Sequence, residues 1–294
     1  MKELNIIDCK NASSPINISM SKIMGPCVLK CDYNYKYGKY TPNVTNNKDY
    51  LFLNYSGKSD PVTYNNEKYN VLETRVYSPS LHTYNGKQAD GEILIVHNGP
   101  GKNLIVSIPF TVGDKSDLGS VQLNNLVNEA NTRTPNNGES VTISFGDFSL
   151  DNFLPDKKGF FSYTGTLPYT PCNGTYSYIV YSIQDSINIS QANLKNLLKI
   201  IKSTKVKLHE NVFFFNKKGA NSSTSDDNIY IDCQPVDEEG KLYINETTGK
   251  TGGGFDIDIN FEQLEPFMFA IIGIIIASGI VYTSRYMLKK FRDA

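Results

Sequence analysis

Short apolar runs separated by turn-forming residues fill most of the first 215 residues of this chain. Each run is rich in Ile, Val, Phe or Tyr and is bounded by Gly, Pro, Asn or Asp, which is typical of β-strands. The clearest runs cover residues 92–97, 104–112, 141–145, 177–183 and 212–215. The run at 92–97 is continuous rather than alternating, which indicates a strand buried on both faces. The pattern predicts a β-rich domain of the α+β class.

Two segments show helical spacing instead. Apolar side chains recur at i, i+3, i+4 and i+7 in Leu194, Leu197, Leu198 and Ile201. Ser190 stands just before them, where a helix N-cap is expected. The other predicted helix covers roughly residues 121–130. Both are expected at the periphery of the sheet.

An apolar run near the C-terminus sets the predicted topology of the whole chain. Residues 266–284 carry no charged side chain, and as a helix they would be ~28 Å long, close to the ~30 Å thickness of a bilayer core. Four basic residues follow in the tail, which places the tail on the cytoplasmic side and the large N-terminal part on the other face. The N-terminus lacks the apolar region of a signal peptide. We therefore expect a single-pass protein with a C-terminal anchor.

The chain thus divides into four predicted parts. Residues 1–218 form the globular domain, 219–265 a polar extension and linker, 266–284 the transmembrane helix, and 285–294 a short basic tail. The stretch 229–233 is a further strand candidate. With a formal net charge of -1, and about -4 once the tail is removed, the composition offers no nucleic-acid signature. The expected partner is the lipid membrane, together with a ligand or protein still to be found.

Five cysteines leave at least one thiol free or available to a second chain, so a disulfide-linked homodimer is possible. Cys27 and Cys31 are a poor metal signature, because no second pair or nearby His completes four ligands. They read as free thiols or as a disulfide, and the pairing of Cys233 is left open. We expect no cofactor.

Several motifs resemble the α-carbonic anhydrases in the right order and at the right spacing over residues 9–205. They are Ser-Pro-Ile-Asn-Ile at 14–18, Ser-Leu-His-Thr at 80–83, Glu-Ile-Leu-Ile-Val-His-Asn at 92–98, Phe-Ser-Tyr-Thr-Gly-Thr-Leu at 161–167 and Ile-Asn-Ile-Ser at 187–190. The resemblance implies a carbonic anhydrase-like fold, with a large central, twisted, mostly antiparallel sheet of about ten strands. It also implies a cleft on that sheet.

The same resemblance implies that the family's zinc site is lost. Catalytic zinc needs three protein ligands and an open position for water, and the family uses three histidines. By alignment these positions hold Arg75, Tyr77 and Leu94. Pro168 stands where a hydroxyl should orient the zinc-bound hydroxide, so Glu92 is expected to have lost its hydroxyl partner. Tyr169 would enter the substrate cleft.

The histidines that remain resemble structural ones of the family. His82 and His97 are expected to be core residues hydrogen-bonded to backbone. Many extracellular family members also join a Cys before the Ser-Pro-Ile-Asn-Ile motif to one after the active-site loop, which implies a Cys9–Cys172 disulfide here.

Together, a zinc-less carbonic anhydrase-like domain and a C-terminal anchor resemble virion membrane proteins of large DNA viruses, notably poxviruses. That resemblance implies a non-enzymatic viral envelope protein that binds sulfated glycosaminoglycan at the host-cell surface. Arg75, Tyr77 and Tyr169 are then possible ligand-binding residues, with basic support from Lys36, Lys39, Lys87 and Lys102. The alternative is a minor structural protein that tethers the viral membrane to capsid or coat proteins. An enzymatic role is the least favoured.

Overall fold

The structure is a computed structural model that describes residues 6–7, 11–27, 31–144, 146–203 and 205–222. Chain contacts divide the protein into two compact units, Met1–Asp227 and Asn228–Ala294. All described residues belong to the first unit. Asn221 Oδ1 still accepts a hydrogen bond from the backbone of Tyr35 at 2.8 Å, so packing continues past the expected domain boundary at residue 218.

Strands account for most of the described elements. The first nine are β1 (Ile6–Ile7), β2 (Asn17–Ile18), β3 (Ile23–Pro26), β4 (Tyr33–Tyr35), β5 (Asn43–Asn46), β6 (Leu51–Asn54), β7 (Val62–Tyr64), β8 (Glu67–Tyr77) and β9 (Thr83–Tyr84). The others are β10 (Lys87–Gln88), β11 (Gly91–Asn98), β12 (Asn103–Val112), β13 (Ser140–Thr142), β14 (Phe160–Gly165), β15 (Tyr176–Tyr181), β16 (Ile187–Ile189), β17 (Lys205–Val206) and β18 (Phe213–Asn216). The α-helices are α1 (Leu118–Arg133) and α2 (Gln191–Ile200), and short 3-10 turns are η1 (Met20–Lys22), η2 (Leu150–Phe153) and η3 (Ile183–Asp185).

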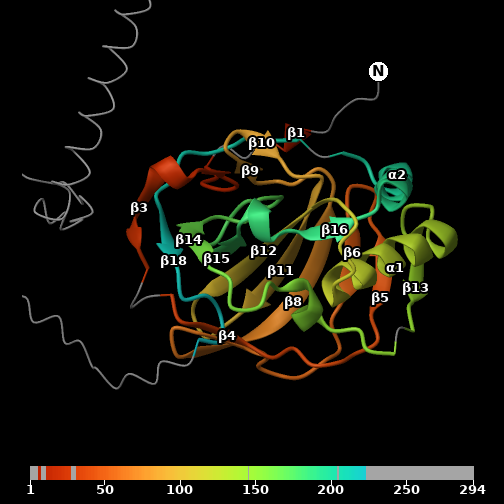
Figure 1. Cartoon of the computed structure of the whole chain (residues 1–294), viewed down its shortest axis with the longest axis horizontal. Coiled ribbons are helices and arrows are strands. Elements are labelled where there is room, and N and C mark those ends of the chain that lie inside the picture. Colours follow the sequence, from red (N-terminus) through yellow and green to blue (C-terminus); the bar gives the residue numbers. More distant parts are fainter. Residues whose placement is uncertain (1–5, 8–10, 28–30, 145, 204, 223–294) are drawn as a thin grey trace, which may run out of the picture. The chain divides into compact units, whose positions relative to one another are not determined.

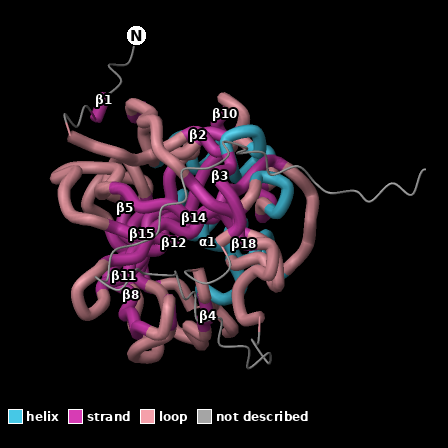
Figure 2. The backbone as a smooth tube through the Cα atoms, turned by 90° about the vertical axis from the view of Figure 1, so that its left-hand side faces the viewer, coloured by secondary structure: helices cyan, strands magenta, loops and turns pink. Residues whose placement is uncertain are grey.

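One sheet of 13 strands forms the frame of the domain. Its main path runs β13-β5-β6-β8-β11-β12-β15-β14-β18-β3, with β16 beside β12 and with β7 and β4 beside β8. The sheet is mixed, since β12 pairs in parallel with β15 and β16 and β18 pairs in parallel with β3, while its other pairings are antiparallel. β8, β11 and β12 lie at its centre (Figure 1). Figure 2 shows the strands running through the middle of the molecule with loops around them. The prediction of a β-rich α+β domain with a large central, mostly antiparallel sheet is confirmed.

Two apolar clusters lie against the sheet. The larger contains the buried sides of both helices, including Leu123 and Leu126 of α1 and Leu197 of α2. The smaller contains Tyr77, Leu94 and other side chains that face away from the helices. α1 and α2 lie next to each other on the helical side (Figure 1). The face that carried the predicted site is therefore not covered by a helix of the described part.

Polar side chains bond to the backbone at the ends of the helices. The Ser190 hydroxyl accepts from the backbone of Asn193, which confirms the predicted N-cap of α2. Asp117 caps α1 in the same way, so this helix begins three residues before the predicted stretch. The amide of buried Asn46 donates to the carbonyl oxygens of Thr134 and Ile200, both at 3.0 Å. One side chain of β5 thus satisfies carbonyls at the C-terminal ends of both helices.

The predicted strands reappear with small shifts at their ends. β11 is buried at every position except Asn98, as its continuous apolar run predicts. The strand predicted at 141–145 was too long, because the ladder with β5 ends at Thr142. Among the described helices, none has the length and apolar character to cross a bilayer. The predicted membrane span at 266–284 and the strand candidate at 229–233 lie outside the described residues.

Candidate functional site

The three predicted metal positions come together at the centre of the sheet. In the antiparallel pairing of β8 with β11, Arg75 lies directly opposite Leu94. Tyr77 is two residues further along β8, so its side chain leaves the same face. Tyr77 and Leu94 are both buried in the smaller apolar cluster, which also includes Tyr169. The three positions that the resemblance named therefore share one face at the centre of the sheet.

Arg75 does not point into an open cleft, because its guanidinium is stacked between two tyrosine rings. Its central carbon lies 3.6 Å from the centre of the Tyr169 ring and 4.3 Å from that of Tyr50. Tyr169 comes from the loop between β14 and β15, and Tyr50 directly precedes β6. Two segments far apart in sequence thus hold one cation through cation–π contacts.

The hydrogen bonds of the guanidinium are made within the same cluster. Arg75 Nη2 donates to Glu73 Oε2 at 3.0 Å, and Nη1 donates to the Tyr77 hydroxyl at 3.2 Å. The Tyr169 hydroxyl donates to the other oxygen of Glu73. Arg75 Nε is buried and has no acceptor among the described residues. We call Tyr50, Glu73, Arg75, Tyr77 and Tyr169 the arginine clamp.

The clamp is enclosed and close to neutral. The side chains of Arg75 and Glu73 are only 14% and 17% exposed. Burial alone would lower the pKa of Arg75, but the facing Tyr77, Tyr169 and Glu73 raise it, so the cation is permanent. Burial raises the pKa of Tyr77, opposed by Arg75, so this hydroxyl stays protonated. The charges of Arg75 and Glu73 therefore neutralise each other within the clamp.

The residues present do not fit a zinc ion. Leu94 has no donor atom, Arg75 brings a positive charge to a ligand position, and the Tyr77 hydroxyl is bonded to Arg75. Within the described ranges, no group of three His, Cys, Asp or Glu side chains could hold a metal ion. The clamp offers stacking and hydrogen bonding, not Lewis-acid chemistry.

Glu92 is part of a separate buried network beside the clamp. Its carboxylate accepts from the backbone of Leu81 at 2.7 Å and of His82 at 3.1 Å, from the Ser107 hydroxyl, and from His82 Nδ1. Burial alone would raise the pKa of Glu92, but His82 and these hydrogen bonds lower it. Glu92 nevertheless has a hydroxyl partner in Ser107 of β12, which differs from the hydroxyl that the resemblance expects at the position of Pro168.

Both histidines lie in the core, as predicted. The predicted backbone bonding is wrong for the His82 imidazole, because its Nδ1 bonds to the Glu92 carboxylate and its Nε2 is 2.7 Å from the Tyr163 hydroxyl. His97 Nδ1 donates to the Leu104 carbonyl oxygen at 3.3 Å, and its Nε2 therefore accepts from the Tyr37 hydroxyl at 2.9 Å. Burial lowers the pKa of His97 to about 4, so it is neutral near pH 7.

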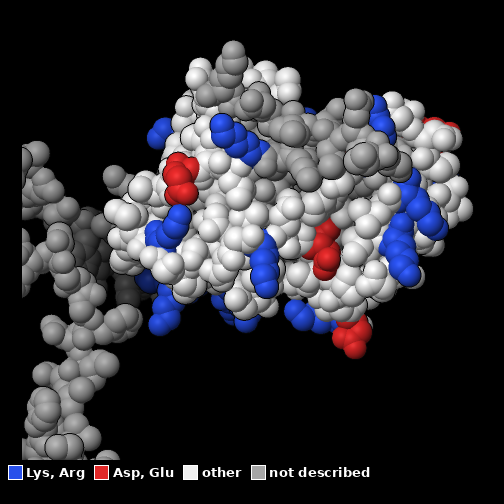
Figure 3. Space-filling model, turned by 90° about the horizontal axis from the view of Figure 1, so that it is seen from above, with Lys and Arg blue, Asp and Glu red and all other residues white. Residues whose placement is uncertain are grey.

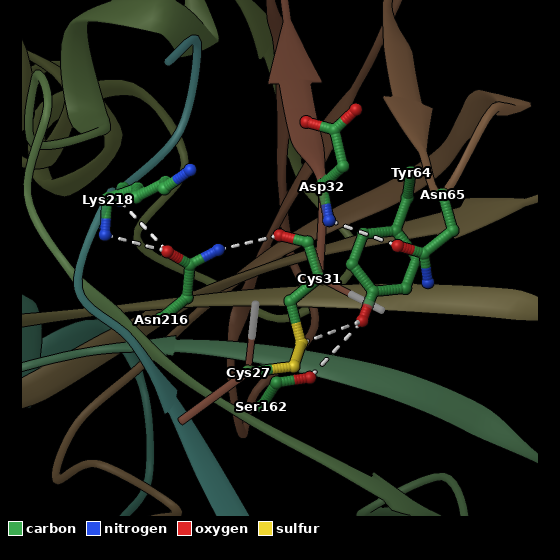
Figure 4. Close-up of a disulfide and its surroundings, with 9 residues drawn as sticks. Cys27, Cys31, Asp32, Tyr64, Asn65, Ser162, Asn216 and Lys218 are labelled. Atoms are coloured by element: carbon green, nitrogen blue, oxygen red, sulfur yellow. Dashed lines mark hydrogen bonds between the residues drawn. A yellow bond between two sulfur atoms is a disulfide. The ribbon is translucent and has the colours of Figure 1, made fainter. Parts of the chain in front are cut away.

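Three cysteines of the described residues are in disulfides. Cys27 and Cys31 form a disulfide with a Cα–Cα distance of 5.7 Å, and the Tyr64 hydroxyl lies between Cys31 Sγ and Ser162 (Figure 4). This selects the disulfide from the two alternatives that the sequence left open. Cys172 also takes part in a disulfide. Cys9, its predicted partner, lies outside the described residues, so that pairing stays a prediction.

The lysines considered as support for Arg75 are not gathered around it. Lys39 pairs with Asp147. Lys87 and Lys102 flank opposite ends of β11, an eight-residue strand and so ~26 Å long. Sequence reasoning also missed Glu73 and Tyr50. Glu73 could have been found from the sequence, because it is two residues before Arg75 on the same strand and so shares its face. No sequence pattern links Tyr50 to Arg75.

Comparisons with known proteins agree with this fold. The sequence profile of eukaryotic-type carbonic anhydrases matches residues 4–213. Alpha carbonic anhydrases 4 and 6 of Arabidopsis thaliana are 22% and 21% identical over 149 and 138 residues, which are 50% and 47% of this chain. The aligned parts are 52% and 48% of those proteins, so the chain spans about half the length of the curated relatives it matches.

Solved structures show the same architecture. Dioscorin in complex with ascorbate superposes with a TM-score of 0.60 at 17% identity, covering 71% of this chain and 87% of dioscorin. The α-carbonic anhydrase of Thermovibrio ammonificans, in complex with sulfanilamide, superposes with a TM-score of 0.58 at 19% identity. The superposition covers 70% of this chain and 87% of that enzyme. These likenesses establish the fold alone. Because the profile matches well over half of the sequence, the chain belongs to the eukaryotic-type carbonic anhydrase family.

Proposed function

We propose that this protein is a non-enzymatic, membrane-anchored binding module that attaches to sulfated glycans on a host-cell surface from a virion membrane. The observation that carries the proposal is the arginine clamp. Its members fill the positions where the family holds its metal, and they satisfy one another. A domain that keeps the fold without the metal ligands is suited to binding rather than to hydration chemistry.

The charge of the described domain supports an anionic ligand. The described residues carry 20 Lys and Arg against 16 Asp and Glu, a net charge of +4. The acidic residues of the chain are concentrated elsewhere, since residues 223–265 carry eleven Asp and Glu against two Lys. The value near -4 expected for everything before the tail averages these two parts. A positive domain attracts sulfated polysaccharides through long-range electrostatics.

The proposed location rests on the sequence. The uncharged stretch at 266–284 and the basic residues after it predict an anchor whose tail faces the cytoplasmic or inner side. The carbonic anhydrase-like domain then faces outward. On that face it would be free to meet glycans of a host cell.

Two measurements on the full-length protein in non-ionic detergent test the proposal. The first is binding to immobilised chondroitin sulfate and heparan sulfate over a salt series, with uncharged dextran as the control surface. We expect binding that weakens steeply as salt rises. No binding at low salt would exclude the glycan. The second is zinc content with carbon dioxide hydration, where stoichiometric zinc and activity would overturn the non-enzymatic assignment.

A second candidate is a structural role, in which the domain tethers the viral membrane to capsid or coat proteins. Two half-buried tyrosines, Tyr35 and Tyr55, suit protein contacts as well as glycan contacts. Protease treatment of intact particles separates the two roles. A domain digested from outside favours attachment, and a protected domain favours the tether.

A further inference from the structure

A row of lysines follows the exposed side of α2 and continues past its end. Lys195 and Lys199 are one helical turn apart, and both are exposed. Lys202 follows the helix, and its backbone N–H donates to the carbonyl oxygen of Lys48 at 2.6 Å. That bond brings exposed Lys48, from the β5–β6 turn, beside the end of α2. We call Lys48, Lys195, Lys199 and Lys202 the lysine strip.

The strip is not neutralised by the described part of the protein. Residues 186–209 contain no Asp or Glu. Three lysines elsewhere are paired, Lys22 with Glu210, Lys39 with Asp147 and Lys158 with Asp185. None of the salt bridges between described residues involves the strip. The ammonium of Lys199 contacts only the Asn196 amide oxygen, at 3.3 Å. Asp49, next to Lys48, is the acidic residue nearest in sequence.

The surface view agrees with this distribution. Figure 3 looks down on the side of the molecule where β10 and α2 lie in Figure 1. Blue basic side chains gather at its right, in the region of α2, with fewer red acidic side chains among them. Other basic side chains are spread over the rest of this view, so the strip is one part of a largely basic face.

From these contacts we infer that the lysine strip is the surface that holds a sulfated polysaccharide, and not the former zinc cleft. This inference rests on the proposed function and names the site for it. The ammonium groups are strongly hydrated point charges on flexible stems. Successive ones along α2 are spaced by ~6 Å, the rise of one turn. A linear polyanion can contact several in register and release its counterions as it does so.

The strip is not suited to insertion into a membrane. Leu194, Leu197 and Ile200 form the apolar side of α2, and all three are buried against the sheet. Leu198, at 46% exposed, is the large apolar side chain that α2 leaves outside. A helix that binds at a membrane surface needs a broad apolar face for the lipid. The apolar face of α2 is already packed in the protein core.

The test compares two triple variants of the full-length protein with equal net charge. One is K195E/K199E/K202E on the strip. The other is K58E/K68E/K217E, which changes three exposed lysines of other loops and strands. Binding to immobilised heparan sulfate is measured over a salt series, and far-UV circular dichroism with thermal melting verifies that both variants fold.

We expect the strip variant to lose at least about tenfold in affinity, with a logarithmic salt slope lower by about 2–3. The control variant should keep most of the affinity and most of the salt slope. Equal losses in the two variants would overturn the inference, because binding would then follow net charge alone. Unchanged binding by a folded strip variant would overturn it too.

Two further outcomes separate the site from the function. If the unaltered protein binds no sulfated glycan, the proposed function fails and the inference falls with it. If the unaltered protein binds vesicles rich in anionic phospholipid through the strip but not the glycan, the strip is a lipid contact. If the unaltered protein and the control variant bind glycan and the strip variant does not, the result supports both the proposed function and the lysine strip as its site.

Discussion

The guanidinium carbon of Arg75 lies 3.6 Å from the centre of the Tyr169 ring, while Glu73 bonds to both residues. An arginine of the central strand β8 is therefore held by a side chain from the β14–β15 loop. The contact explains how a positive charge is tolerated near the centre of a β-sheet. Arg75 has four partners in the clamp rather than one. Each partner also contacts another member of the clamp.

Glu73→Gln should destabilise the fold by about 1–3 kcal/mol, because it leaves the enclosed Arg75 charge without its counter-ion. The measurement is the free energy of unfolding of the full-length protein in urea, followed by circular dichroism. Glu129→Gln is the matched control, since Glu129 pairs with Arg133 on the exposed side of α1, and should change stability by less than about 1 kcal/mol. A double variant E73Q/R75M should cost less than E73Q alone. Equal effects of E73Q and E129Q would contradict the clamp.

The stability of the domain should fall as the pH drops from about 6.5 to about 4, in part through His97. Burial lowers its folded pKa to about 4, so over this range the unfolded chain binds a proton that the folded chain does not. The loss amounts to ~3 kcal/mol at most, from a pKa difference of roughly 2.5. Glu92, whose pKa is also lowered, adds a loss only below about pH 4.5.

The variant His97→Gln tests this, because it keeps a polar group facing Tyr37 and removes the titration. Its free energy of unfolding should be lower at pH 7 but flatter between pH 6.5 and pH 4. A slope as steep as that of the unaltered protein would show that other groups govern the acid response.

Restoring histidines at the three positions should restore zinc binding without activity. Arg75→His, Tyr77→His and Leu94→His together place three imidazoles on one face of β8 and β11. Equilibrium dialysis with elemental analysis should find about one zinc per chain, whereas the unaltered protein should retain none. Hydration activity should stay absent while Tyr169 lies over the site. Zinc bound equally by the unaltered protein would contradict our reading of the clamp.

Deletion of residues 266–284 should convert the protein from membrane-bound to extractable. Alkaline carbonate washing of membranes should leave the full chain in the pellet and release the deleted form. A deletion of equal length within 223–265 is the control and should leave the protein in the pellet. Release of the full chain by carbonate would argue against the anchor.

Much of the fold could be predicted because its signals are local. The apolar run of β11 and the Ser190 cap of α2 each depend on neighbours in sequence, and both match the structure. The strand at 141–145 was extended too far because its end depends on pairing with β5, which sequence spacing does not show. The mixture of parallel and antiparallel pairs likewise came from long-range contacts.

The sequence named residues of the candidate site but did not predict which other side chains contact Arg75. Arg75, Tyr77 and Leu94 were located by resemblance, yet the partners that enclose Arg75 come from distant segments. Only Glu73 could have been found locally. The lysine strip was missed for a related reason, since Lys48 joins α2 through a backbone contact over 150 residues of chain.

The closed packing of Arg75 has a consequence for the history of this domain. Replacing Glu73 alone leaves a buried cation, and replacing Arg75 alone leaves a carboxylate enclosed by tyrosines. Each single step away from the present arrangement is therefore less stable than its start. Placing metal ligands at these positions would therefore require several substitutions at once. The present packing is consequently preserved by selection for stability, whatever ligand the surface binds.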